Sequence, residues 1–227
     1  MAIQTLAALL RHQASKALGK PGVPAPSSPF RIGMVVTMDP TPFILGGDAL
    51  KIQMPDLDAT DSIVAVSRMS GTGPDSFRLH LPDGKSWLHV IAGTGGAVDE
   101  CRFFQRIDEA YPANADEWTF WLGAADGYIG YPQFQSRDGQ LWARHWNPGE
   151  QRLAPLSARE EFSTFRDATE RREQRQHTHM LYSRSTGLQS PCPEAEYLLV
   201  TAVEAPGTAR IEIHAGIDID PAAFSLS

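Results

Sequence analysis

Residues 2–18 place apolar side chains at three- and four-residue steps, the spacing of one face of an α-helix. Ile3, Leu6 and Leu10 fall on this apolar face, whereas Arg11 and Lys16 fall largely outside it. Gly19 ends the pattern, and residues 19–29 contain four prolines, which block helix and favour a semi-extended linker. The pattern therefore predicts an amphipathic helix at 1–18, joined by a tether at 19–29 to the rest of the chain.

From Phe30 onward the pattern changes to short β-type runs separated by turn residues, typical of antiparallel sheets. We predict one β-rich globular domain over 30–227, an antiparallel sandwich or barrel-like fold with one short internal helix. The predicted strands are 31–38, 48–54, 62–69, 76–81, 86–92, 97–104, 140–146, 174–184, 196–204 and 209–217.

The clearest alternation lies in residues 209–217. Ile211 and Ile213 fall on one face and Glu212 and His214 on the other, which predicts a strand buried on one side only. Residues 196–204 are apolar on both faces, which predicts a central strand.

The internal helix is expected at 114–122. Asn114 is suited to the N-cap, and Asp116 and Glu117 would lie in the first turn beside the positive end of the helix dipole. These roles account for both carboxylates, so we do not assign them to a glycosidase-type acid pair.

Charge and cysteine content exclude some classes of function. The net charge is −7, which argues against general nucleic-acid binding, and the basic excess is confined to residues 1–38, with four basic and no acidic residues. The two cysteines are far apart, which disfavours a disulfide framework or a zinc knuckle and fits a reducing cytoplasm. We expect no export signal, no spanning helix and no cofactor.

Aromatic residues are concentrated between Tyr111 and Trp146, which hold nine of the twenty aromatic residues and four of the five tryptophans. Such a cluster forms either a core or a binding face. We expect it to do both, with the binding face formed by the outward-pointing side chains of Trp118, Tyr128, Tyr131 and Trp142.

Two histidines two positions apart would share one face of a strand. His177 and His179 would then supply two ligands to a metal, a site that needs a third ligand; the alternative is a pair that packs or hydrogen-bonds within the fold. Residues 166–176 mix arginines with acids, which predicts a solvated loop or strand edge.

The apolar face of the predicted N-terminal helix could pack on its own domain or on a second subunit. Alternatively, it could bind in the groove of a partner or lie on an anionic membrane. Residues Ile3, Leu6, Leu10, Arg11 and Lys16 would make this contact.

Four stretches resemble the YjfK-like bacterial family of proteins of unknown function (DUF2491). They are RIGMVVTMDPTPFILGGDAL, DEWTFWLGAADGYIGYPQFQSRDG, HMLYSR, and EYLLVTAVE with GIDIDP, and the resemblance spans Phe30 to Phe224 without the preceding helix and linker. The family has no established activity. Genes for similar proteins lie beside relatives of phage shock protein A, which implies a cytoplasmic accessory role at the inner membrane.

The sequence thus favours a non-enzymatic binding or adaptor protein of an envelope-stress assembly, with a phage shock protein A-like partner. The alternative is a small-ligand- or metal-binding enzyme that uses an aromatic cleft with His177 and His179. The oligomeric state stays open.

Overall fold

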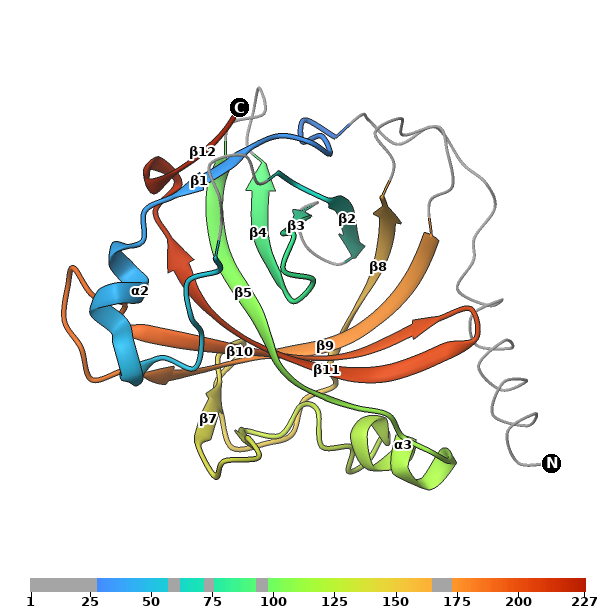
Figure 1. Ribbon diagram of the computed structural model, residues 1–227. Helices are drawn as coiled ribbons and strands as arrows, with labels where there is room; N and C mark the ends of the chain where they lie inside the picture. Colours follow the sequence, from blue (N-terminus) through green and yellow to red (C-terminus); the bar gives the residue numbers. More distant parts are fainter. Residues whose placement is uncertain (1–27, 57–61, 72–75, 93–97, 165–172) are drawn as a thin grey trace.

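The fold is an antiparallel β-barrel. The computed structural model describes residues 28–56, 62–71, 76–92, 98–164 and 173–227. Ten strands form one sheet, and eight of them close into a barrel in the order β2-β3-β4-β5-β11-β10-β9-β8, with β8 returning to β2 (Figure 1). The β-rich, barrel-like prediction is confirmed.

The described part of the chain forms four short helices and twelve strands. Two α-helices and two 3-10 helices are described: α2 (Thr41–Gly46), α3 (Ala115–Leu122), η1 (Gly47–Ala49) and η3 (Pro221–Ala223). The strands are β1 (Val36–Met38), β2 (Ala65–Gly71), β3 (Ser76–His80), β4 (Ser86–Ala92), β5 (Val98–Ala110), β6 (Gln133–Gln135), β7 (Leu141–Arg144), β8 (Leu156–Ser163), β9 (Glu173–Ser185), β10 (Ala195–Ala205), β11 (Thr208–Ile219) and β12 (Phe224–Leu226).

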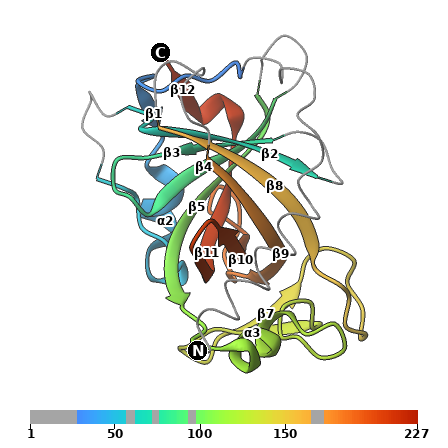
Figure 2. The same ribbon diagram turned by 90° about the vertical axis from the view of Figure 1, so that its right-hand side faces the viewer.

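The barrel consists of two four-stranded meanders, β2 to β5 and β8 to β11. They join along two seams: Val66 of β2 pairs with Ser163 of β8, and Phe103 of β5 pairs with Ile217 of β11. Strands β1 and β12 pair with each other on one side of the barrel, and α3 and β7 lie on the opposite side (Figures 1 and 2). Each seam joins segments that are distant in sequence.

The main hydrophobic core lies on the outer side of the barrel wall. Alternate residues of each strand point to this side, among them Leu79, Leu88, Phe103 and Ile211. They are fully buried because segments that surround the barrel cover them, for example through Phe43 of α2. The alternate residues of the same strands face the barrel interior. Both faces of these strands are therefore buried, which corrects the prediction that 209–217 has a solvated polar face.

The segment between β5 and β8 contains the aromatic cluster. Its helix α3 begins after Asn114, whose side-chain oxygen accepts the Glu117 N–H at 2.9 Å, so the predicted cap is confirmed. The segment is hydrogen-bonded to the barrel at Gly130, whose N–H donates to the hydroxyl of Tyr182 in β9 at 2.9 Å.

One predicted strand is wrong. Residues 48–54 alternate as expected, with Leu50 and Ile52 buried, but their backbone bonds to side chains instead of a neighbouring strand. The N–H of Lys51 donates to Glu196 at 2.5 Å, and the N–H of Gln53 donates to Gln105 at 3.2 Å. The run 31–38 is a strand only at Val36–Met38, and α2, β6, β8 and β12 were not predicted.

Candidate functional site

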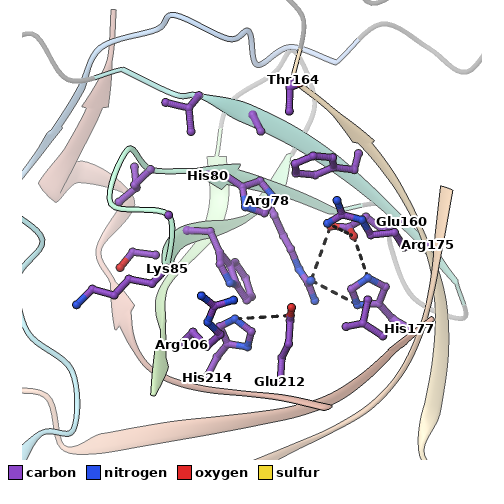
Figure 3. Close-up of a pocket in the computed structure, with 18 of the residues that line it drawn as sticks. Arg78, His80, Lys85, Arg106, Glu160, Thr164, Arg175, His177, Glu212 and His214 are labelled. Carbon is purple, nitrogen blue, oxygen red and sulfur yellow. Dashed lines mark hydrogen bonds and ion pairs between the residues drawn. The ribbon is translucent and has the colours of Figure 1, made fainter. Parts of the chain in front are cut away.

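The barrel interior is polar at the end of the barrel formed by the β3–β4 and β10–β11 turns. Successive side chains of a strand point to opposite faces, so the strands that send apolar residues outward send charged residues inward. Figure 3 shows these inward side chains converging from both meanders. They are Arg78 and His80 of β3, Glu160 of β8, Arg175 and His177 of β9, and Glu212 and His214 of β11.

These side chains surround a cavity of about 370 Å³. Its volume falls within the range of about 300–1,000 Å³ found for small-molecule sites. Apolar wall is supplied by Trp87, Phe162 and Val203, and the outer end is lined by Lys85 and other partly exposed residues. An eight-stranded barrel is wide enough either to be filled by side chains or to hold one small ligand.

Glu160 is the centre of the buried ion-pair network. Its carboxylate lies 2.9 Å from His177 Nε2, 3.6 Å from Arg175 Nη1 and 3.9 Å from Arg78 Nη1. Burial alone raises the pKa of Glu160, but His177, Arg78 and Arg175 hold it well below its ordinary value. Burial lowers the pKa of His177, so a neutral imidazole donates its Nε2 proton to the ionised Glu160.

Arg78 is the least compensated charge in the network. Its side chain is 7% exposed, and its guanidinium lies over the Trp87 ring at 4.4 Å. Nη1 faces Glu160 and His177, whereas Nε has no hydrogen-bond partner among the described residues. Burial lowers the pKa of Arg78 despite the nearby Glu160 and Glu212. The cation remains protonated, so it is a buried charge with part of its donor edge unused.

Glu212 and His214 form the wall opposite Glu160. Arg210 Nε donates to Glu212 at 2.6 Å, whereas His214 Nε2 lies 3.9 Å from the same carboxylate. His214 packs against Trp87 with a ring distance of 5.5 Å, and within the described residues its Nδ1 has no partner. Burial lowers the pKa of His214 to about 3, so the ring is neutral at pH 7.

The cavity is cationic although the protein is acidic. Five basic side chains (Arg78, Lys85, Arg106, Arg175 and Arg210) and two carboxylates line it, so with neutral histidines its net charge is +3. The whole chain carries −7. Arg175, expected in a solvated segment, is one of these lining residues, which corrects that prediction.

The predicted metal pair does face one side of β9, inside the barrel. His177 is bound to Glu160, whereas His179 packs against Trp146 at a ring distance of 5.6 Å. In the described ranges no group of three or more His, Cys, Asp or Glu residues is arranged to hold a metal ion.

The predicted aromatic residues divide between surface and core. Tyr131 is exposed, and Trp118 and Tyr128 are partly buried. Trp142 is fully buried, so its predicted outward orientation is wrong: β7 turns it into the core, where its indole N–H donates to Ser136 Oγ at 3.0 Å. Phe120, which the sequence analysis did not select, is 57% exposed.

Ile3, Leu6, Leu10, Arg11 and Lys16 of the predicted amphipathic helix lie outside the described residues. Among the residues that are described, no helix has the length and apolar character needed to cross a membrane. The helix, the linker and the domain bounds stay predictions.

Comparison with protein families matches residues 14–225 to the model described as protein of unknown function (DUF2491). The chain belongs to the DUF2491 family. The match includes residues 14–18 of the predicted amphipathic helix and the whole proline-rich linker, so the family extends further toward the N-terminus than the resemblance from Phe30 onward. No curated protein and no solved structure matches the chain.

The cavity residues of this DUF2491 protein were largely missed by sequence reasoning. Arg78 and Glu212 lie in strands where period-two alternation places them between apolar residues, whereas Glu160 lies between Arg159 and Glu161 in a strand that was not predicted. Such a polar face is normally assigned to solvent. The available signal was that both signs of charge and several histidines recur on the polar faces of separate strands.

Proposed function

We propose that this protein is a non-enzymatic binding protein that holds one small ligand inside its barrel. The observation that carries the proposal is the cavity of about 370 Å³ whose buried charged side chains are only partly paired with one another. Buried polar groups are normally satisfied, so the unused N–H of Arg78 in the lining of this cavity points to a ligand.

The ionisation of the cavity residues favours binding over acid–base catalysis. A general acid or base is most effective when its pKa lies near the working pH. Burial lowers the pKa of His80 to about 4 and that of His214 to about 3, and the pKa of Glu160 is held well below its ordinary value. These groups keep one protonation state near neutral pH, as a binding wall requires.

A fluorescent probe tests the proposal on the full chain. Anilinonaphthalene sulfonate, whose emission rises in apolar surroundings, should bind with a stoichiometry of one. Val203→Phe, which places a larger side chain in the cavity, should abolish binding, whereas Tyr131→Phe on the outer surface should not. Equal binding by the wild type and the Val203→Phe variant, with both folded by circular dichroism, would disprove a ligand site in the cavity.

An adaptor role is the second candidate function, favoured by an exposed aromatic surface. The Tyr128 ring lies 5.4 Å from Phe120 and 6.3 Å from Tyr131, and the last two are 57% and 38% exposed. Contiguous exposed aromatic rings are typical of protein interfaces. The proposed partner is a phage shock protein A-like protein on the cytoplasmic side of the inner membrane; this part rests on the family resemblance.

Co-expression with such a partner tests the adaptor role. The wild type should co-purify with it, and Phe120→Ser combined with Tyr131→Ser should remove the complex, because interface aromatics often contribute about 2 kcal/mol or more each. Leu141→Ser, at another exposed apolar residue, serves as the control. Unchanged recovery of the complex with the double variant would exclude this surface.

The N-terminal segment belongs to the same proposal as a peripheral membrane contact. Deletion of residues 1–18 should weaken binding to anionic phospholipid vesicles, because it removes the predicted apolar face and two basic residues. Vesicle binding that is unchanged by the deletion would show that residues 1–18 do not provide the membrane contact.

A further inference from the structure

We infer that the ligand of the barrel cavity is a small organic anion, whose carboxylate or phosphate group binds Arg78 and whose apolar body lies along Trp87, Phe162 and Val203. This inference rests on the proposed binding function and adds the chemical class of the ligand.

The charge of Arg78 is not balanced by a hydrogen-bonded carboxylate among the described residues. Its described carboxylate contact is with Glu160 at 3.9 Å, which is too long for a hydrogen bond, and Glu160 has a closer partner in His177 at 2.9 Å. Transfer of a charge out of water is costly unless the charge is paired and hydrogen-bonded. Arg78 therefore lacks an anion of its own.

The orientation of the Arg78 guanidinium group determines which of its N–H donors face other side chains. Nη1 is directed at Glu160 and His177, as Figure 3 shows, which leaves the edge formed by Nε and Nη2. Two parallel N–H groups on this edge match the two oxygens of a carboxylate or phosphate. The unpartnered state of the buried Nε is the specific sign that this edge awaits an acceptor.

The two carboxylates of the cavity would favour a cationic ligand if they had no partners. Both are already engaged: Glu160 accepts from His177 and lies 3.6 Å from Arg175, and Glu212 accepts from Arg210 at 2.6 Å. The electrostatic potential in the cavity is therefore positive, because basic side chains outnumber carboxylates in its lining and Lys85 lies at its outer end. A cleft lined by one sign of charge concentrates ions of the other sign.

The volume of the cavity limits the size of the ligand. A volume of about 370 Å³ is near the lower end of ligand sites, which fits a molecule with up to three rings or a short chain. The apolar wall formed by Trp87, Phe162 and Val203 would contact this part of the ligand, since burial of apolar surface adds to affinity.

Two probes that differ in charge test the inference on the full chain. Anilinonaphthalene sulfonate is anionic, whereas phenylnaphthylamine has the same two aromatic groups without the sulfonate. We expect the anionic probe to bind at least tenfold more tightly. Arg78→Gln should weaken the anionic probe at least tenfold and change the neutral probe less than twofold, because a hydrogen-bonded charge contact is worth tenfold or more.

Arg102→Gln is the matched control. Arg102 is also an inward arginine, but it binds Asp218 at 2.7 Å and does not line the cavity. Its replacement should leave both probe affinities unchanged. Displacement by naphthoate, naphthyl phosphate and neutral naphthamide then identifies the preferred anionic group: naphthamide should be the weakest competitor.

Two further variants keep the test decisive if Arg78→Gln does not fold. Arg78→Lys keeps the charge and removes the planar two-donor edge, so the anionic probe should bind more weakly than to the wild type. Lys85→Gln changes an exposed side chain and should weaken the same probe by a smaller factor.

The outcomes separate the two proposals. If the neutral probe binds as tightly as the anionic one and Val203→Phe blocks both, the cavity is a ligand site but the ligand is not an anion. If Val203→Phe blocks neither probe, the binding function itself is overturned. Naphthamide that competes as well as naphthoate would also overturn the anionic class.

Discussion

Trp142 and Tyr131 belong to the same aromatic segment but have opposite environments. Trp142 is fully buried and hydrogen-bonded to Ser136, whereas Tyr131 is 38% exposed. Trp142→Ala should lower the free energy of unfolding by about 3–5 kcal/mol, because it removes a buried aromatic side chain and leaves a cavity. Tyr131→Ala should change it by about 0.5 kcal/mol or less.

Urea denaturation of the two variants and the wild type measures this difference. Similar losses for both variants would mean that the two rings are equally buried, contrary to the fold described above.

At the scale of residues, sequence patterns predicted which side chains share a face of a strand. They did not predict whether that face lies in solvent or inside the barrel. The alternation of Ile211 and Ile213 with Glu212 and His214 is real, and both sets are buried. An isolated strand pattern contains no information on whether its polar side meets water or a closed barrel interior, because closure depends on strands elsewhere in the chain. This is why Arg78 and Glu160 were not selected.

Strand β11 depends on a glycine where it crosses β5. A Cβ built at Gly216 would lie 2.4 Å from the Phe103 carbonyl oxygen and 2.5 Å from the Phe104 ring. Gly216→Ala should therefore lower the free energy of unfolding by about 3 kcal/mol, since overpacking costs about 1–3 kcal/mol and here part of the obstacle is backbone.

Gly207 in the β10–β11 turn provides the comparison. Its φ is +83°, and an added Cβ would meet nothing within 4 Å. Gly207→Ala should cost only about 1–2 kcal/mol, the penalty of a left-handed conformation. Thermal or urea unfolding measures both variants; a smaller effect at Gly216 than at Gly207 would contradict close packing of β11 on β5.

At the scale of elements, hairpins with turn residues were predictable and segments held by side chains were not. The prediction 86–92 matches β4, and 174–184 lies within β9. The failure at 48–54 has a physical cause, because Glu196 and Gln105 replace a neighbouring strand as backbone partners. Strand β8 was missed because Arg159, Glu160 and Glu161 interrupt its alternation, and the buried Glu160 is paired with Arg175 of the neighbouring strand β9 and with Arg78 of β3.

Buried histidines make the stability of the whole barrel dependent on pH. Burial lowers the pKa of His80 to about 4 and those of His89, His179 and His214 to about 3, from 6.5 in an unfolded chain. Above pH 6.5 both states are neutral and stability is complete. Below it only the unfolded state takes up protons, so stability falls as pH decreases toward the folded pKa values.

The expected loss is about 1.4 kcal/mol per pH unit for each such histidine below about pH 6.5. Urea denaturation at neutral pH and at about pH 5.5 measures it. His214→Gln should reduce the pH dependence by about one histidine's contribution, whereas His145→Gln, at an exposed position, should reduce it less. A free energy of unfolding that is constant over this range would show that these rings are solvated.

The barrel seams have a consequence for folding kinetics. Hairpin contacts within each meander are local, but the pairing of Val66 with Ser163 joins strands almost a hundred residues apart, and such non-local contacts form slowly. Arg78 and Trp87 come from the first meander, and Glu160 and Glu212 from the second, so the cavity is complete only once both seams have formed. A ligand would therefore bind only after both seams have formed. It would lower the rate of unfolding and leave the rate at which the meanders assemble unchanged.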